Sequence, residues 1–229
     1  MSYDSNEQKD LAVKYVDNLG DHFGVVEYAN KTIAKSARDV PQRAEVLLGI
    51  SKGKSILDIG CSTGELTLLM ADNNTESVVG VDIVDELIDR AISLSERSSV
   101  ERFSKVSFVC GDFYDMGFDD GEFDTIMATE FFEHLPTSAI DSFMIKAIKY
   151  LSKNGNMVIS VPNREPAKKY VDEGRDRWDW PNHLTHFTKN SLNTFLKKYF
   201  GEITFLPVYP NDKISDGIWL IANCTGVKK

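Results

Sequence analysis

The 229 residues predict an α/β fold built on an open, mostly parallel β-sheet with helices on both faces. Three observations support this prediction. Short apolar strands alternate with amphipathic helices, several of the strands end in acidic residues, and a glycine-rich turn joins the first of these strands to a helix. Because α/β sheets of this kind bind ligands outside the carboxyl ends of their strands, the acidic strand ends are the predicted binding site.

The first predicted strand and its turn lie in residues 55–64, which read SILDIGCSTG. Apolar residues form the strand, and leucines and a methionine at helical spacing predict a helix over residues 65–71. Between them, Gly60 and Gly64 let the backbone turn sharply without a Cβ, so that a ligand can lie against main-chain N–H groups at the helix start. Asp58 stands at the carboxyl end of this strand.

Three further apolar strands follow along the chain. The second ends in Asp82, which is suited to accept hydrogen bonds from two ribose hydroxyls. The third, over residues 106–112, ends in Asp112, which can accept a hydrogen bond from an adenine amino group. The fourth, over residues 123–128, runs directly into a polar and aromatic segment. This succession predicts a nucleoside site at one edge of the sheet.

Helices flank these strands. Residues 5–19 and 41–50 predict two helices before the sheet, and we expect this N-terminal part to cover the ligand site. After the fourth strand the pattern predicts a helix over about 137–151 ended by Asn154 and Gly155, a strand at 157–161, a helix at 188–199, and strands at 203–208 and 218–224 that form a hairpin.

Length and composition are typical of one domain over residues 1–229. An apolar run long enough for a spanning helix and a secretory signal are both missing, and the three cysteines follow no disulfide or zinc spacing, so we expect a cytoplasmic protein. The chain carries 35 acidic against 26 basic residues, a net charge of −9, which makes a nucleic-acid partner unlikely on electrostatic grounds. The sequence does not distinguish a monomer from a homodimer.

The ordered set of motifs over residues 45–225 resembles the class I S-adenosylmethionine-dependent methyltransferases. That resemblance implies a Rossmann-like seven-stranded sheet with an antiparallel last strand. It also implies S-adenosylmethionine as cofactor, held in four parts: the methionine by Asp58, Gly60, Cys61 and Gly64, the ribose by Asp82 with Ile83, the adenine by Asp112 and the Phe113 backbone, and the sulfonium above Thr129 or Glu130.

Two other nucleotide-binding motifs fit less well. A nicotinamide-binding fold needs Gly-x-Gly-x-x-Gly, and here Ser62 replaces the middle glycine that lets the pyrophosphate approach the backbone. A P-loop is excluded because the turn has no lysine for the phosphates. Plain strand-end capping remains the structural alternative for the acidic residues.

The acceptor of the methyl group is expected to meet two stretches, the segment 130–136 (EFFEHLP) and the long loop 162–187. The loop contains two tryptophans and two histidines, namely Trp178, Trp180, His183 and His186. A neutral imidazole suits deprotonation of a hydroxyl, so His134 or His186 is the candidate general base, with Glu130 beside it. The alternative is that His134 only holds its loop by a hydrogen bond to a main-chain carbonyl.

The same segment can bind a divalent metal through the candidates Glu130, Glu133, His134 and His183. This Glu-x-x-Glu-His pattern resembles both the small-RNA 3′-terminal 2′-O-methyltransferases and the ubiquinone-biosynthesis O-methyltransferases. The acidic composition favours the second branch, and so methyl transfer to an oxygen, less readily a nitrogen, of a small molecule. The alternatives are a metal-dependent 2′-O-methyltransferase acting on RNA 3′ ends and a non-catalytic S-adenosylmethionine-binding protein.

Overall fold

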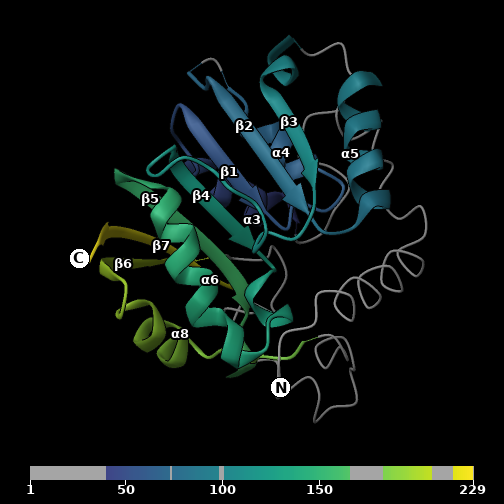
Figure 1. The fold of residues 1–229 in the computed structure, drawn as a ribbon. Coiled ribbons are helices and arrows are strands. Elements are labelled where there is room, and N and C mark those ends of the chain that lie inside the picture. The colour runs from purple at the N-terminus through teal and green to yellow at the C-terminus, as the bar shows by residue number, and fades with distance from the viewer. Residues whose placement is uncertain (1–39, 73, 98–100, 166–182, 208–218, 229) are drawn as a thin grey trace.

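The computed structural model describes residues 40–72, 74–97, 101–165, 183–207 and 219–228, and all of its strands belong to one seven-stranded sheet (Figure 1). The strand order is β3-β2-β1-β4-β5-β7-β6, and β7 runs antiparallel to both of its neighbours. The predicted mostly parallel sheet with an antiparallel last strand is therefore confirmed. The strands are β1 (Ser55–Ile59), β2 (Ser77–Asp82), β3 (Val106–Cys110), β4 (Phe123–Thr129), β5 (Leu151–Pro162), β6 (Phe200–Leu206) and β7 (Trp219–Val227).

The central strands are apolar on both faces because helices cover both. In β1, Ile56 and Leu57 point to opposite sides of the sheet and are both fully buried. The same holds for Ile126 and Met127 in β4. Such continuous apolar runs are typical of parallel strands in the middle of an α/β sheet.

Of the helices in the described residues, three lie on one face of the sheet and two on the other; Figure 1 shows this arrangement. The first face carries α3 (Val40–Ile50), α4 (Glu65–Met70) and α5 (Asp85–Arg97), and the opposite face carries α6 (Thr137–Tyr150) and α8 (Lys189–Leu196). Short 3-10 turns, η1 (Glu101–Lys105) and η2 (Phe132–His134), complete the described elements. The expected helices on both faces are thus present.

The largest core lies between α6, α8 and the sheet. Phe143 of α6 is fully buried and its ring is 5.0 Å from that of Phe113 and 5.1 Å from that of Phe132, measured between centroids. Leu192 and Leu196 of α8 extend this core toward β6 and β7. Because this core reaches residues that directly follow β3 and β4, it fixes the loops at the carboxyl ends of these strands.

Helix α6 ends at Tyr150, and β5 begins at the next residue, so Gly155 lies inside a strand and does not end the helix as predicted. The pairing of β5 with β4 is irregular between Phe123 and Thr125. A Cβ on Gly155 would lie 2.8 Å from the Asp124 carbonyl oxygen, so the glycine permits close approach of two strands.

Some sequence predictions fall outside the described residues. These are the helix at 5–19, most of the acceptor loop (residues 166–182, with Trp178 and Trp180) and the turn between β6 and β7. Among the residues that are described, no helix combines the length and apolar character needed to cross a lipid bilayer.

Candidate functional site

Three acidic residues meet at one edge of the sheet, as the sequence predicts. Strands β3, β2 and β1 are adjacent and parallel, so their carboxyl ends lie side by side. Asp58 belongs to the end of β1, Asp82 is the last residue of β2, and Asp112 follows β3 by two residues. The register pairs Asp82 with Cys110, and the Gly111 N–H donates to the Asp82 carbonyl at 2.8 Å.

The turn between β1 and α4 takes the left-handed conformation at three of five residues. Gly60 has φ +74°, Ser62 has φ +51° and Gly64 has φ +78°. Ser62 thus adopts a conformation that usually belongs to glycine. The glycines also make room for protein side chains, because a Cβ on Gly60 would lie 2.6 Å from the Phe131 ring and one on Gly64 would lie 2.7 Å from the Phe108 ring.

Main-chain N–H groups of this turn mostly donate within the protein. Those of Gly60 and Cys61 both donate to the Val81 carbonyl, at 2.8 and 3.0 Å, and that of Gly64 donates to the Cys61 carbonyl at 3.0 Å. The Ser62 N–H donates to the Asp82 carboxylate at 2.9 Å. The N–H groups of Gly60, Cys61 and Ser62 thus attach the turn to β2, and that of Gly64 closes the turn on itself.

Cys61 contributes no exposed thiol to the site. Its side chain is buried, and Sγ lies 3.0 Å from where a Cβ on Gly80 would be. Burial raises the pKa of the Cys61 thiol far above its usual range, and the nearby carboxylates of Asp58 and Asp82 raise it further. A neutral, buried thiol of this kind serves packing and not nucleophilic chemistry.

Asp58 is the most perturbed carboxylate in the site. It is 2% exposed, and the Thr67 hydroxyl of α4 donates to Oδ2 at 2.7 Å. Burial raises the pKa of the Asp58 carboxyl to about 6, the hydrogen bond from Thr67 opposes this, and the charge of Asp82 adds to it. Within the described residues, Oδ1 finds no hydrogen-bond partner. A buried carboxylate oxygen with unused acceptor capacity fits a cationic ligand group.

Asp82 is held from both sides by main-chain amides. Oδ2 accepts from Ser62 N at 2.9 Å, and Oδ1 accepts from Val84 N at 3.0 Å. Burial raises the pKa of the Asp82 carboxyl, while these hydrogen bonds lower it. A carboxylate oxygen can accept two hydrogen bonds, so both oxygens of Asp82 can still accept from ribose hydroxyls. Ile83, half-buried beside it, packs against Val84 and Leu87 of the neighbouring turn and helix.

The segment after β3 offers main chain and not a large side chain. Asp112 is half-buried, and its Oδ1 accepts from Tyr114 N at 2.9 Å. The Phe113 side chain is 5% exposed and packs into the α6 core, with its ring 6.1 Å from that of Tyr150. The Phe113 side chain is therefore part of the core, which leaves only its backbone to face a ligand, and its role toward an adenine stays a prediction.

Thr129 and Glu130 lie at the carboxyl end of β4. Both are half-buried, and Glu130 has φ +51°, in the left-handed region. The buried Ser160 of β5 fixes this turn twice, because Glu130 N donates to its carbonyl at 2.8 Å and its hydroxyl donates to Glu130 Oε1 at 2.9 Å.

A second group of polar side chains follows β4. Glu133, His134 and His183 each offer a ligand atom, and these atoms lie within 4.8 Å of one another. Glu133 is 2% exposed, and the two imidazole rings are 5.1 Å apart in a T-shaped arrangement. Glu130, although predicted as a ligand, does not belong to this group, and neither does the exposed His186.

Sequence reasoning missed two residues that support these groups. Thr67 is a fully buried polar residue among leucines in α4, and Ser160 is a fully buried polar residue in an apolar strand. A polar side chain at a core position of a helix or strand is the signal that marks both of them.

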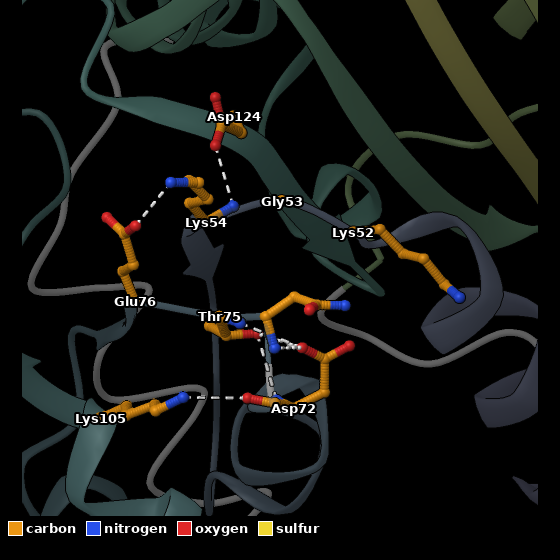
Figure 2. Close-up of a pocket in the computed structure, with 9 residues that line it drawn as sticks. Lys52, Gly53, Lys54, Asp72, Thr75, Glu76, Lys105 and Asp124 are labelled. Atoms are coloured by element: carbon orange, nitrogen blue, oxygen red, sulfur yellow. Dashed lines mark hydrogen bonds and ion pairs between the residues drawn. The ribbon is translucent and has the colours of Figure 1, made fainter.

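A hollow of about 910 Å³ lies at the other end of the sheet, beside the start of β1 (Figure 2). Figure 2 shows Lys54 paired with Glu76, at 2.7 Å, and Lys54 N donating to Asp124 at 2.9 Å. Lys105 donates to the Asp72 carbonyl at 3.1 Å. These contacts join the residues that precede β1, β2 and β3 to one another and to Asp124 in β4, so we assign this hollow a structural role.

Comparison with known proteins supports the family predicted from the sequence. A family model described as a methyltransferase domain matches residues 50–199. The 27-O-demethylrifamycin SV methyltransferase of Amycolatopsis mediterranei is 28% identical over 115 residues, covering 50% of this chain and 42% of that protein. A sterol 24-C-methyltransferase of Aspergillus fumigatus is 37% identical over 89 residues (39% and 23%), and ajmaline N-methyltransferase of Rauvolfia serpentina is 30% identical over 108 residues (47% and 36%). The chain thus spans less than half the length of these relatives.

Solved structures agree on the fold. A SAM-dependent methyltransferase from Thermotoga maritima superposes with a TM-score of 0.66 at 15% identity, over 96% of this chain and 99% of that one. The methyltransferase domain of bacterial CtHen1 superposes with a TM-score of 0.62 at 21% identity, over 80% and 97%. The sequence relatives include O-, C- and N-methyltransferases, so they do not single out the ubiquinone-biosynthesis branch.

Proposed function

Because this chain belongs to the class I S-adenosylmethionine-dependent methyltransferases, we propose that it transfers the methyl group of S-adenosylmethionine to an oxygen of a small-molecule acceptor. The observation that carries the choice of oxygen is the group of Glu133, His134 and His183 directly after β4. A hydroxyl acceptor must lose a proton during methyl transfer, and imidazole is the side chain best suited to take it near neutral pH.

The cofactor-binding roles follow the strand order. Asp58 receives the methionine ammonium on its unused oxygen, and Gly60, Cys61 and Gly64 form the turn beside it. In this proposal Asp82 and Ile83 hold the ribose, Asp112 and the Phe113 backbone hold the adenine, and Thr129 or Glu130 lies under the sulfonium, because these residues stand at or just after the ends of β2, β3 and β4. When bound, S-adenosylmethionine supplies an electrophilic methyl carbon with a neutral sulfide as leaving group.

His134 is the proposed general base. His134 would take the proton of the acceptor hydroxyl, and S-adenosylmethionine would supply the methyl group and leave as S-adenosylhomocysteine. His186 remains the second candidate, although it is exposed and lies outside the group of Glu133, His134 and His183. Alignment of the acceptor with the leaving sulfur supplies the rest of the rate.

Glu133, His134 and His183 also fit a divalent metal, because one carboxylate and two imidazoles within 4.8 Å are ligands that Mn²⁺ or Zn²⁺ accepts. In this role the three side chains would hold the ion, which lowers the pKa of a bound hydroxyl. Metal content measured after purification without chelators, together with turnover with and without EDTA, tests this role.

The acidic composition supports a small-molecule acceptor, and RNA is the second candidate because the Glu-x-x-Glu-His pattern at residues 130–134 resembles that of the small-RNA 3′-terminal 2′-O-methyltransferases. A cytoplasmic location is proposed because the cysteines at positions 61, 110 and 224 form no disulfide within the described residues. The domain boundaries are proposed as residues 1–229, with residues 1–50 as cover and 162–187 as acceptor loop.

Release of S-adenosylhomocysteine across an acceptor panel tests the proposal. The panel contains phenols, quinols, sugars, primary amines and a short RNA with a free 3′ end. We expect turnover with a hydroxyl acceptor. His134→Ala should slow this turnover about 100-fold or more and leave the affinity for S-adenosylhomocysteine within twofold of wild type. Asp82→Ala should abolish binding of S-adenosylhomocysteine. Turnover only with amines or only with RNA would reject the assignment, and binding without turnover across the panel would favour a non-catalytic binder.

A further inference from the structure

We propose that Thr185 is a positioning residue that holds His183 against His134 and Glu133. Nothing in the local sequence pattern joins these residues, because His183 and His134 lie on segments almost fifty positions apart. The inference rests on the proposed function only in taking this cluster as the acceptor side of the site. Hydrogen bonds join residues 184 and 185 to the backbone of η2 and of Leu135, which follows it.

Two main-chain bonds and one side-chain bond join the segments. The N–H groups of Leu184 and Thr185 both donate to the Glu133 carbonyl, at 2.7 and 3.0 Å. The Thr185 hydroxyl then donates to the Leu135 carbonyl at 2.7 Å. Because both main-chain bonds end at one acceptor atom, the segment could still rotate about that atom. The bond from the Thr185 hydroxyl to a second carbonyl prevents this rotation.

Among the described residues, packing gives this segment little support. Leu184 is 42% exposed, His186 is exposed, and His183 and Thr185 are only half-buried. Burial begins only at Phe187, which is 6% exposed and whose carbonyl accepts from Arg164 N at 2.7 Å. Between Glu133 and Phe187, hydrogen bonds therefore set the position of the backbone that carries His183.

The same hydroxyl also contacts the start of α6. Thr185 Oγ1 lies 3.2 Å from Thr137 Oγ1, and because it donates to Leu135 it can accept from Thr137. Thr185 therefore connects three features: the backbone of η2, the first residue of α6 and the segment that bears His183. A hydroxyl is the group that makes both bonds at once, since it is donor and acceptor.

Thr185→Val tests the inference, because valine keeps the branched shape and removes only the hydroxyl. The rescue variant is Thr185→Ser, and the matched control is Thr204→Val, an exposed threonine on β6 far from the site. S-adenosylhomocysteine titration confirms that each variant is folded, and we expect all affinities within twofold of wild type.

Two readouts measure the position of His183. Nuclear Overhauser contacts between the His134 and His183 ring protons, expected from the 5.1 Å centroid distance, should be present in wild type, Thr185→Ser and Thr204→Val, and lost in Thr185→Val. Titration with Co²⁺ alone should give about tenfold weaker binding in Thr185→Val and recovery to within about threefold in Thr185→Ser.

The outcomes separate this inference from the proposed function. Retention of the ring contact in Thr185→Val, or its loss in Thr185→Ser to the same extent, would overturn the positioning role. If wild type binds no Co²⁺ but the ring contact responds to the hydroxyl as stated, the metal role fails and the positioning role stands. If wild type binds Co²⁺ and Thr185→Val binds it equally well, the metal role stands and the positioning role fails.

Discussion

Asp58 gives the site a pH dependence that can be worked out from its burial. The pKa of its carboxyl is about 6 against an ordinary value of 3.8. If the methionine ammonium needs the ionised carboxylate, about nine tenths of the protein is competent at pH 7 and about one tenth at pH 5. We therefore expect the Kd for S-adenosylhomocysteine to be about tenfold higher at pH 5 than at pH 7.

The same shift affects stability, with a definite sign. Because the folded pKa is raised, the unfolded chain releases its proton first as the pH rises, so the ligand-free protein loses stability between about pH 4 and pH 6. The full loss is about 3 kcal/mol. Asp58→Asn removes this loss and keeps a side-chain oxygen for Thr67, so at pH 7 we expect its melting temperature to rise by roughly 6 °C or more.

Isothermal titration at pH 5, 6 and 7 and thermal melts over the same range check both statements. In Asp58→Asn, binding should be weaker at pH 7 and the tenfold dependence attributed to Asp58 should disappear, while any remainder belongs to Asp82, whose pKa is also raised. Asp89→Asn, on the exposed side of α5, is the control for a lost surface charge. A Kd that is constant from pH 5 to pH 7 in wild type, or that varies equally in Asp58→Asn, would refute the reasoning.

Three further substitutions test the packing described above, each measured by urea unfolding. Ser62→Gly should stabilise the protein by about 0.5–1 kcal/mol because glycine adopts φ +51° without strain; a destabilised variant would contradict the strain argument. Gly64→Ala should cost about 2–4 kcal/mol, since its Cβ would lie 2.7 Å from the Phe108 ring, and a neutral result would mean that this ring moves freely. Lys54→Met should change stability by less than about 0.5 kcal/mol, because Lys54 and Glu76 are 70% and 65% exposed; a larger loss would give the hollow more than a local role.

The fold was accessible from the sequence because its signals are local. Asp58 and Asp82 can be recognised because each stands at the end of an apolar run. Parallel strands that are adjacent in the sheet then bring their carboxyl ends together. The left-handed Ser62 was not accessible, because its conformation is imposed by the hydrogen bond from its N–H to Asp82 and not by its own preference. The cofactor roles of these residues remain predictions.

The acceptor side depends on contacts that spacing cannot encode. Glu130 and Glu133 are three residues apart and look equivalent in the sequence. In the structure Glu130 accepts a hydrogen bond from the Ser160 hydroxyl, whereas Glu133 lies in the cluster with His134. His183 joins them from a stretch without periodicity, through main-chain bonds to the Glu133 carbonyl. Tertiary hydrogen bonds, which leave no local pattern, therefore decide which side chains form the cluster.

The turn between β1 and α4 is bonded to β2 by the main-chain amides of residues 60–62. The rings of Phe131 and Phe108 pack against it where Gly60 and Gly64 have no Cβ. Such a surface has little freedom left to lose when a ligand arrives. The entropy of arranging it is lost once, when the chain folds, and is not lost again in every catalytic cycle. Association with the methyl donor should accordingly be a single fast step whose rate follows concentration linearly, without the plateau that a rearranging turn would impose.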